Sequence, residues 1–132
     1  MALNRTAVFP NTFRVYVAQA TTAEASLTAP TNVATVYPNT SGAAAKCTLL
    51  RVKANMATTA SNVRIFLYDG TTYYLWKEVL TATLTPSGTV KSFEWEEAQD
   101  IDIPTGWSIR ATTVGGDDVS VFAHIGEYLY TA

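Results

Sequence analysis

The feature that most constrains the fold of this chain is a pair of β-rich segments joined by an Asp-Gly dipeptide. Residues 63–68 and 71–80 are rich in β-branched and aromatic side chains, and Asp69-Gly70 stands between them. These residue types favour strands. Glycine also tolerates the positive φ angle that a tight primed turn requires. The segment therefore predicts a β-hairpin whose two strands are connected by a two-residue primed turn.

Several other short segments alternate between apolar and polar residues with a period of two, which is typical of half-buried strands. Turn residues separate them, and no long window carries a helical apolar stripe. The segments are 13–17, 33–37, 49–54, 90–96, 101–103, 107–112 and 119–125. Eight or nine short strands predict an all-β, antiparallel β-sandwich that is jelly-roll-like. An immunoglobulin-like sandwich is the alternative, although the Cys…Trp…Cys framework of true immunoglobulin domains is absent.

The length of 132 residues fits one domain. We divide the chain into an extended N-terminal arm, residues 1–12, and a single β-sandwich domain, residues 13–132. The first ten residues have apolar side chains without a sustained period and end at Pro10. Such a segment either packs back on its own domain or lies as an arm on a neighbouring subunit.

One strand carries bulky side chains on both of its faces. Val63, Ile65 and Leu67 alternate with Arg64, Phe66 and Tyr68. Two interpretations are open: the strand is central and covered on both faces, or one of its faces meets a partner.

Composition excludes several classes of partner. Charged residues make up 15% of the chain, below the roughly 25% of an average soluble domain. The net charge is −2 and no run of Lys or Arg forms a stripe, so we expect no binding to nucleic acid or to a membrane. No apolar run is long enough to span a bilayer, and the first residues lack the apolar core of a signal peptide. The lone cysteine, Cys47, cannot form an internal disulfide, so we expect a cytoplasmic site of synthesis.

Residues for catalysis or metal binding are sparse, and we predict that the protein is not an enzyme and has no cofactor. His124 is the single histidine. It shares a strand face with Phe122 and Ser120, and we interpret it as a satisfied or solvent-facing side chain, with a general base as the alternative. With Cys47 as the single cysteine, a zinc site of the usual kind is excluded. The acidic pairs are interpreted as solvated strand edges or turns, with a cation site as the alternative. Paired acids for glycoside hydrolysis stay open. The pairs are Asp100 with Asp102, and Asp117 with Asp118.

Three segments together resemble small structural proteins of tailed bacteriophages and prophages. They are Val63-Arg64-Ile65-Phe66-Leu67-Tyr68-Asp69-Gly70, Tyr73-Tyr74-Leu75-Trp76-Lys77-Glu78-Val79, and Pro104-Thr105-Gly106-Trp107-Ser108-Ile109-Arg110-Ala111-Thr112. The opening Asn4-Arg5-Thr6 and the later Val15-Tyr16-Val17-Ala18-Gln19 are similar too. The resemblance implies a virion component, and in particular a head decoration (cement) protein. Proteins of this kind often sit as trimers on the lattice of the major capsid protein.

On this hypothesis the protein is assembled in the host bacterial cytoplasm and resides on the capsid surface. The arm and the start of the first strand would contact the capsid or a neighbouring subunit, through Leu3, Arg5, Val8, Phe9, Phe13 and Arg14. Two alternatives stay open. The chain could be a tail or head-fibre module, or a carbohydrate-binding jelly roll that stacks Trp76 or Tyr74 on sugar rings.

Overall fold

The computed structural model describes residues 10–39 and 43–128, which form eight β-strands and no helix. None of these residues therefore belongs to a helix that could cross a membrane. The strands are β1 (Thr12–Ala20), β2 (Ala34–Tyr37), β3 (Ala45–Ala54), β4 (Ser61–Tyr68), β5 (Tyr73–Thr81), β6 (Glu94–Ile103), β7 (Ser108–Thr113) and β8 (Val119–Glu127).

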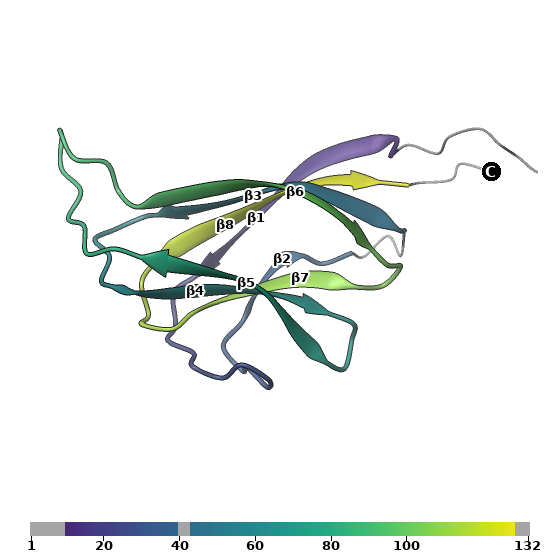
Figure 1. The fold of residues 1–132 in the computed structure, drawn as a ribbon, viewed down its shortest axis with the longest axis horizontal. Coiled ribbons are helices and arrows are strands. Elements are labelled where there is room, and N and C mark those ends of the chain that lie inside the picture. Colours follow the sequence, from purple (N-terminus) through teal and green to yellow (C-terminus); the bar gives the residue numbers. More distant parts are fainter. Residues whose placement is uncertain (1–9, 40–42, 129–132) are drawn as a thin grey trace, which may run out of the picture.

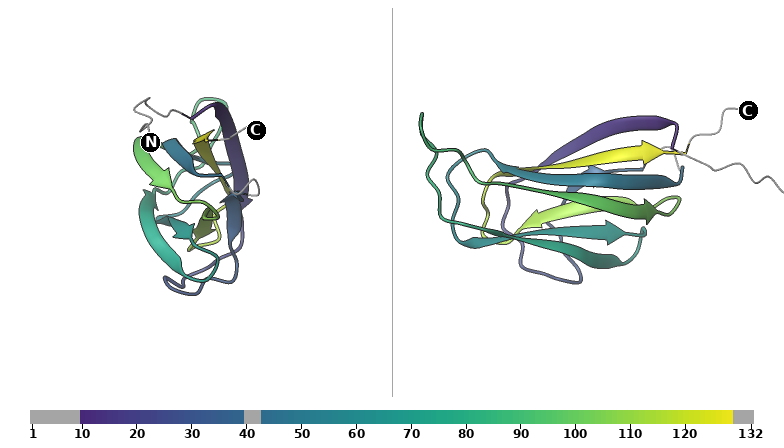
Figure 2. Two further views of the ribbon diagram at one scale, coloured as in Figure 1. Left: turned by 90° about the vertical axis from the view of Figure 1, so that its right-hand side faces the viewer. Right: turned by 45° about the horizontal axis from the view of Figure 1, so that its top comes forward.

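The strands form two four-stranded sheets packed face to face. The first sheet has the order β1-β8-β3-β6, and the second has the order β2-β7-β4-β5. Every strand pair within the sheets is antiparallel. Figures 1 and 2 show the two layers lying along one another with β1 outermost in its sheet. The all-β class, the antiparallel pairing and the sandwich are confirmed.

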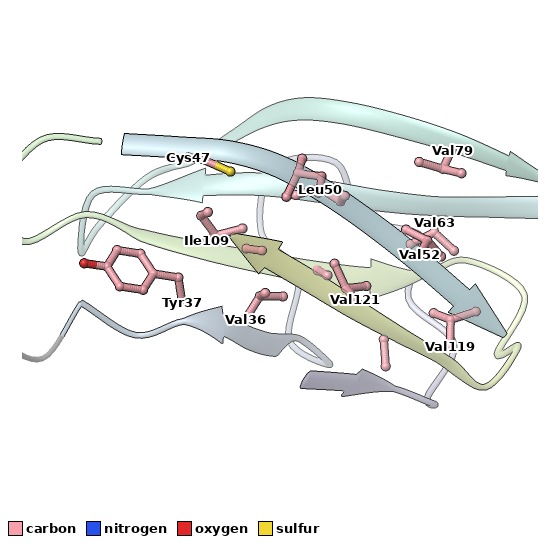
Figure 3. Close-up of a cluster of buried hydrophobic side chains, with 14 of the residues drawn as sticks. Val36, Tyr37, Cys47, Leu50, Val52, Val63, Val79, Ile109, Val119 and Val121 are labelled. Atoms are coloured by element: carbon pink, nitrogen blue, oxygen red, sulfur yellow. The ribbon is translucent and has the colours of Figure 1, made fainter. Parts of the chain in front are cut away.

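The hydrophobic core lies between the sheets and follows the alternation along the strands (Figure 3). In β3, Leu50, Val52 and Ala54 are buried, while the alternate side chains are half-exposed. The register of β3 against its neighbours shifts next to Thr48, so the inward positions before it are odd-numbered and those after it are even-numbered. Cys47 lies in this core, as expected.

The hairpin between β4 and β5 is confirmed, but the expected two-residue primed turn is wrong. Residues 69–72 form a four-residue connection. One carboxyl oxygen of Asp69, Oδ1, accepts hydrogen bonds from the backbone N–H groups of Thr71 (2.8 Å) and Thr72 (2.7 Å). These two bonds also lower the pKa of Asp69. The side chain thus organises a wider loop in which Gly70 takes the positive φ of 103°.

The segments 90–96 and 101–103, expected as separate strands, are corrected to the single strand β6, which begins at Glu94. Residues 96–100 are polar or small and interrupt the alternation. The strand nevertheless pairs with β3 on both sides of a register shift that falls between Ala98 and Ile101. An edge strand can carry polar residues along its length because solvent reaches them. The sequence alternation can therefore be interrupted at a place where the strand itself continues.

The strand β4 is central in its sheet and buries side chains on both faces, which supports the first of the two interpretations. Phe66 is fully buried on the face away from the core and contacts Tyr73 edge to face, with ring centroids 5.8 Å apart. On the same face, Arg64 Nη1 donates a 2.8 Å hydrogen bond to the carbonyl of Ala25, in the segment between β1 and β2. A covering layer of the chain's own residues therefore lies outside the second sheet.

Candidate functional site

The edge strand β1 presents a row of large apolar side chains to solvent. Phe13, Val15 and Val17 point away from the core and are 69%, 55% and 54% exposed. The alternate residues of the strand point inward, and Tyr16 packs edge to face on Tyr37 of β2 with ring centroids 4.8 Å apart. The strand is thus anchored through one face, while its other face offers an apolar surface to a partner.

The apolar row continues onto the two strands beside β1. Val15 pairs with His124 and Val17 with Phe122 on β8. On the far side of β8, Leu49 of β3 pairs with the same His124. We call Phe13, Val15, Val17, Leu49, Phe122 and His124 the β1 patch. Phe122 and Leu49 are half-buried, whereas His124 is exposed, as expected from the strand alternation.

A shallow hollow of about 210 Å³ opens within the β1 patch. It lies over the pairing between β1 and β8, so residues of both strands form its walls, together with one residue of β3. Its lining residues are Phe13, Arg14, Val15, Thr48, His124 and Ile125. A protruding apolar side chain of a partner could insert into this hollow.

The other half of the same sheet face carries charged side chains that form ion pairs with one another. Lys46 Nζ lies 2.6 Å from Asp100 Oδ1, and Lys53 Nζ lies 3.2 Å from Glu94 Oε2. The hydrogen bond to Asp100 raises the pKa of Lys46, and the hydrogen bond from Lys53 lowers the pKa of Glu94. The face is therefore divided into an apolar part along β1 and a charged part along β3 and β6.

The predicted contact residues divide among three places. Phe13 lies in the β1 patch, whereas Arg14 is exposed, alternates with the patch residues along the strand and also lines the hollow. The remaining four, Leu3, Arg5, Val8 and Phe9, lie outside the described residues.

Sequence reasoning missed Val15, Val17, Leu49 and Phe122 as members of the surface. The alternation of Phe13, Val15 and Val17 was visible in the sequence, but alternation alone does not tell which face of an edge strand is covered. The signal that could have helped is Tyr16, a bulky residue on the opposite face of the strand. A single hydrophobic core can cover only one of the two faces, so the other face must be exposed or covered by something else.

The acidic pairs do not assemble a cation site within the described residues. Asp100 pairs with Lys46, and Asp118 Oδ1 accepts a 2.8 Å hydrogen bond from Asn55 Nδ2. The interpretation of Asp117 as a solvated turn residue is wrong, because its carboxyl group is buried and accepts hydrogen bonds from the backbone and hydroxyl of Thr59. In the parts of the chain at 10–39 and 43–128, no group of three His, Cys, Asp or Glu side chains is placed to hold a metal ion.

The aromatic residues considered for sugar stacking are already engaged. Tyr74 is 46% exposed, but one face of its ring is stacked on Trp107 at 5.5 Å between centroids and an angle of 8°. Its hydroxyl donates to Asp69 at 3.3 Å. Trp76 is half-buried and packs against the core. Of these two aromatic side chains, Tyr74 is the more exposed.

Comparison with known proteins adds no relative: no protein-family model matches the chain, and no curated protein matches its sequence.

Proposed function

We propose that the chain is a structural protein of a tailed-phage virion, a capsid decoration (cement) protein that binds and stabilises the major capsid lattice. The observation that carries the proposal is the β1 patch, because three large apolar side chains more than half exposed on one strand are typical of an interaction surface. The sandwich behind it supplies the rigid support that such a contact needs. The sequence resemblance supplies the class of partner.

We also propose that the sandwich is a jelly roll. In this topology the first strand lies beside the last, and the second lies beside the seventh, as two Greek keys require. The neighbours β1-β8 and β2-β7 agree with that arrangement. Viral shell proteins use this fold often, which is in line with the proposed function without deciding it.

On this proposal the partners are the major capsid protein and further copies of the chain on the capsid surface, with three copies being the number that the resemblance implies. Each contact can be weak. A lattice holds neighbouring sites at high effective concentration, so many weak contacts sum to firm attachment. The role requires no catalytic group.

The test measures occupancy on capsids that lack the protein. Heads from a phage unable to make this chain are mixed with purified protein, and bound copies are counted by quantitative gel analysis. We expect Phe13→Ser to reduce occupancy at a given concentration, because the patch loses its most exposed aromatic side chain. The matched control is Leu80→Ser on β5, since Leu80 is 76% exposed and lies in the other sheet. Equal occupancy for both variants would remove the β1 patch from capsid binding.

A second arm of this test concerns the predicted N-terminal arm. Removing residues 1–9 leaves β1 intact, whereas a deletion through Arg14 would also remove the first three residues of that strand. Loss of binding on the shorter deletion would support the arm as a capsid contact. Unchanged binding would exclude the arm from the mechanism.

Imaging distinguishes the capsid surface from the alternative location, a tail or head fibre. An antibody fragment or gold label directed at the protein, viewed on intact particles in negative stain, should decorate the head surface. Label confined to the tail or to fibres would overturn the decoration role while leaving a virion role in place. Absence of the protein from purified particles, checked by mass spectrometry, would overturn both.

A further inference from the structure

The sandwich has four edge strands, and three of them carry features that discourage pairing with another chain. Strand β2 has only four residues. Strand β6 carries five acidic residues, and β5 carries a lysine and a glutamate. All three also pair with their inner neighbour through a register shift, which bends an edge away from a flat geometry. Bulges, charges and short length protect these edges.

The fourth edge, β1, has the fewest of these protections. Its nine residues pair with β8 without a register shift. It contains no proline and no lysine, and Arg14 is its single charged residue. At about 3.4 Å per residue the strand is about 30 Å long. Among the described residues no other strand pairs with its outer edge, so every second backbone N–H and C=O group there is open to a further strand.

We propose that β1 pairs antiparallel with β1 of a second copy of this chain, about a twofold axis at Val15. In this register Val15 faces its own counterpart, and Phe13 faces Val17 of the other copy. The exposed row of each copy thereby meets the exposed row of its partner through apolar cross-strand pairs. Because one residue pairs with itself at the axis, the contact is isologous and closed, and it cannot grow into a filament.

The charges on β1 agree with pairing to itself. In the same register Arg14 faces Tyr16 of the other copy, so the two arginines do not face each other. Tyr16 donates its hydroxyl proton to a carboxyl oxygen of Glu127. Each Arg14 would therefore lie near a carboxyl group of its partner, which favours the contact. The strand is complementary to itself in its apolar pattern, and the register places no arginine directly opposite another.

The pairing has a consequence for the face that remains exposed. It would join two four-stranded sheets into one of eight strands and bring the two β1 patches side by side across the axis. The apolar surface would then be twice as wide. This inference does not rest on the proposed function, and it predicts an even number of copies where the resemblance implies three.

The first experiment measures mass against concentration by sedimentation equilibrium. We expect the full chain to associate to two copies and Val15→Lys to weaken that association about tenfold or more, because two lysines would face each other at the axis. The matched control is Leu80→Lys, since Leu80 is exposed on the protected edge β5, and it should associate like the unmodified protein. Far-ultraviolet circular dichroism of both variants checks that they are folded.

The second experiment is a cross-link that does not depend on weakening the contact. Residues that face each other in an antiparallel pair have Cα atoms about 4.5–5.5 Å apart, within the range of a disulfide. Val15→Cys should form a covalent dimer on mild oxidation, while Leu80→Cys should not. The native Cys47 is buried and does not compete, since burial also raises its thiol pKa to about 11.

The outcomes separate this inference from the proposed function. A monomer at every accessible concentration, without a cross-link at residue 15, would overturn the pairing. A trimer that Val15→Lys leaves unchanged would overturn it as well, while supporting the number of copies expected of a decoration protein. A dimer lost in Val15→Lys, with Leu80→Lys unaffected, would support the pairing whatever the protein binds.

Discussion

The hydroxyl of Tyr16 donates a 2.7 Å hydrogen bond to the carboxyl oxygen Oε1 of Glu127, joining the first strand to the end of the last across 111 positions of sequence. Glu127 is buried, and the Tyr16 ring also packs on Tyr37 of the opposite sheet. Burial, followed by the bond to Glu127, raises the pKa of Tyr16. One side chain thus fixes the edge strand β1 to both sheets, so that its outward row is presented in a defined geometry.

We expect Tyr16→Phe to lower the free energy of unfolding by about 1 to 3 kcal/mol, because a buried carboxyl group loses a hydrogen-bond donor. Urea denaturation at a single protein concentration measures the change. The control is Tyr74→Phe, whose hydroxyl makes a 3.3 Å bond to half-exposed Asp69, and we expect a change below about 0.5 kcal/mol there. Equal effects of the two substitutions would contradict the anchoring role of Tyr16.

The buried thiol of Cys47 predicts a specific loss of stability at alkaline pH. Burial raises its pKa from 9.0 to about 11. Below pH 9 the thiol is protonated in both states; between pH 9 and 11 the unfolded chain releases the proton while the folded chain keeps it. Stability contributed by the thiol is therefore lost as the pH rises through this window, by up to about 3 kcal/mol.

The measurement compares unfolding free energies of the unmodified protein and Cys47→Ala at pH 8 and pH 10.5. Other groups titrate in this range in both proteins, so the difference between the two slopes isolates the thiol. We expect the alanine variant to lose less stability on going to the higher pH. Parallel slopes would mean that the thiol is solvated in the folded state.

The sequence was sufficient for the parts of the fold that depend on local alternation. The alternating segment 49–54 is part of β3, and its residues Leu50, Val52 and Ala54 are buried on one face because a period of two is a direct property of extended backbone. The β4–β5 hairpin was also recognisable. Its turn was not, because the Asp69 side chain accepts two backbone hydrogen bonds and stabilises a four-residue loop instead of the two-residue turn that Asp-Gly favours.

The candidate site depended on information that alternation does not contain. Phe13, Val15 and Val17 look like a core-facing row in the sequence, yet they point outward because Tyr16 on the opposite face occupies the space beside Tyr37. The bond from Tyr16 to Glu127 joins residues at opposite ends of the chain. Such long-range pairings follow from the strand order, which a single sequence does not specify.

The buried carboxyl group of Asp117 is expected to hold two loops together at one end of the sandwich. It accepts a hydrogen bond from the backbone N–H of Thr59 at 3.2 Å and another from the Thr59 hydroxyl at 3.3 Å. Asp117→Asn places an amide N–H group against these donors, and we expect a loss of about 1 to 3 kcal/mol in urea denaturation. Asp102→Asn, on an exposed strand position, should change stability by less than about 0.5 kcal/mol.

The two phenylalanines Phe66 and Phe13 offer the sharpest comparison of buried and exposed positions. Phe66 is fully buried outside the main core, against Tyr73, whereas Phe13 is 69% exposed on β1. We expect Phe66→Ala to lower the free energy of unfolding by about 3 to 5 kcal/mol, because removal of the ring leaves a cavity among the residues packed around it. Phe13→Ala should change it by less than about 0.5 kcal/mol.

These two variants must be compared at a concentration where the protein is monomeric, since self-association would add stability that Phe13→Ala removes. Under that condition the contrast tests whether Phe13 contributes to folding at all. A large loss for Phe13→Ala in the monomer would mean that the row on β1 is packed against the chain's own residues. In that case the row is not a surface held open for a partner, and both the proposed capsid contact and the strand pairing would lose their main support.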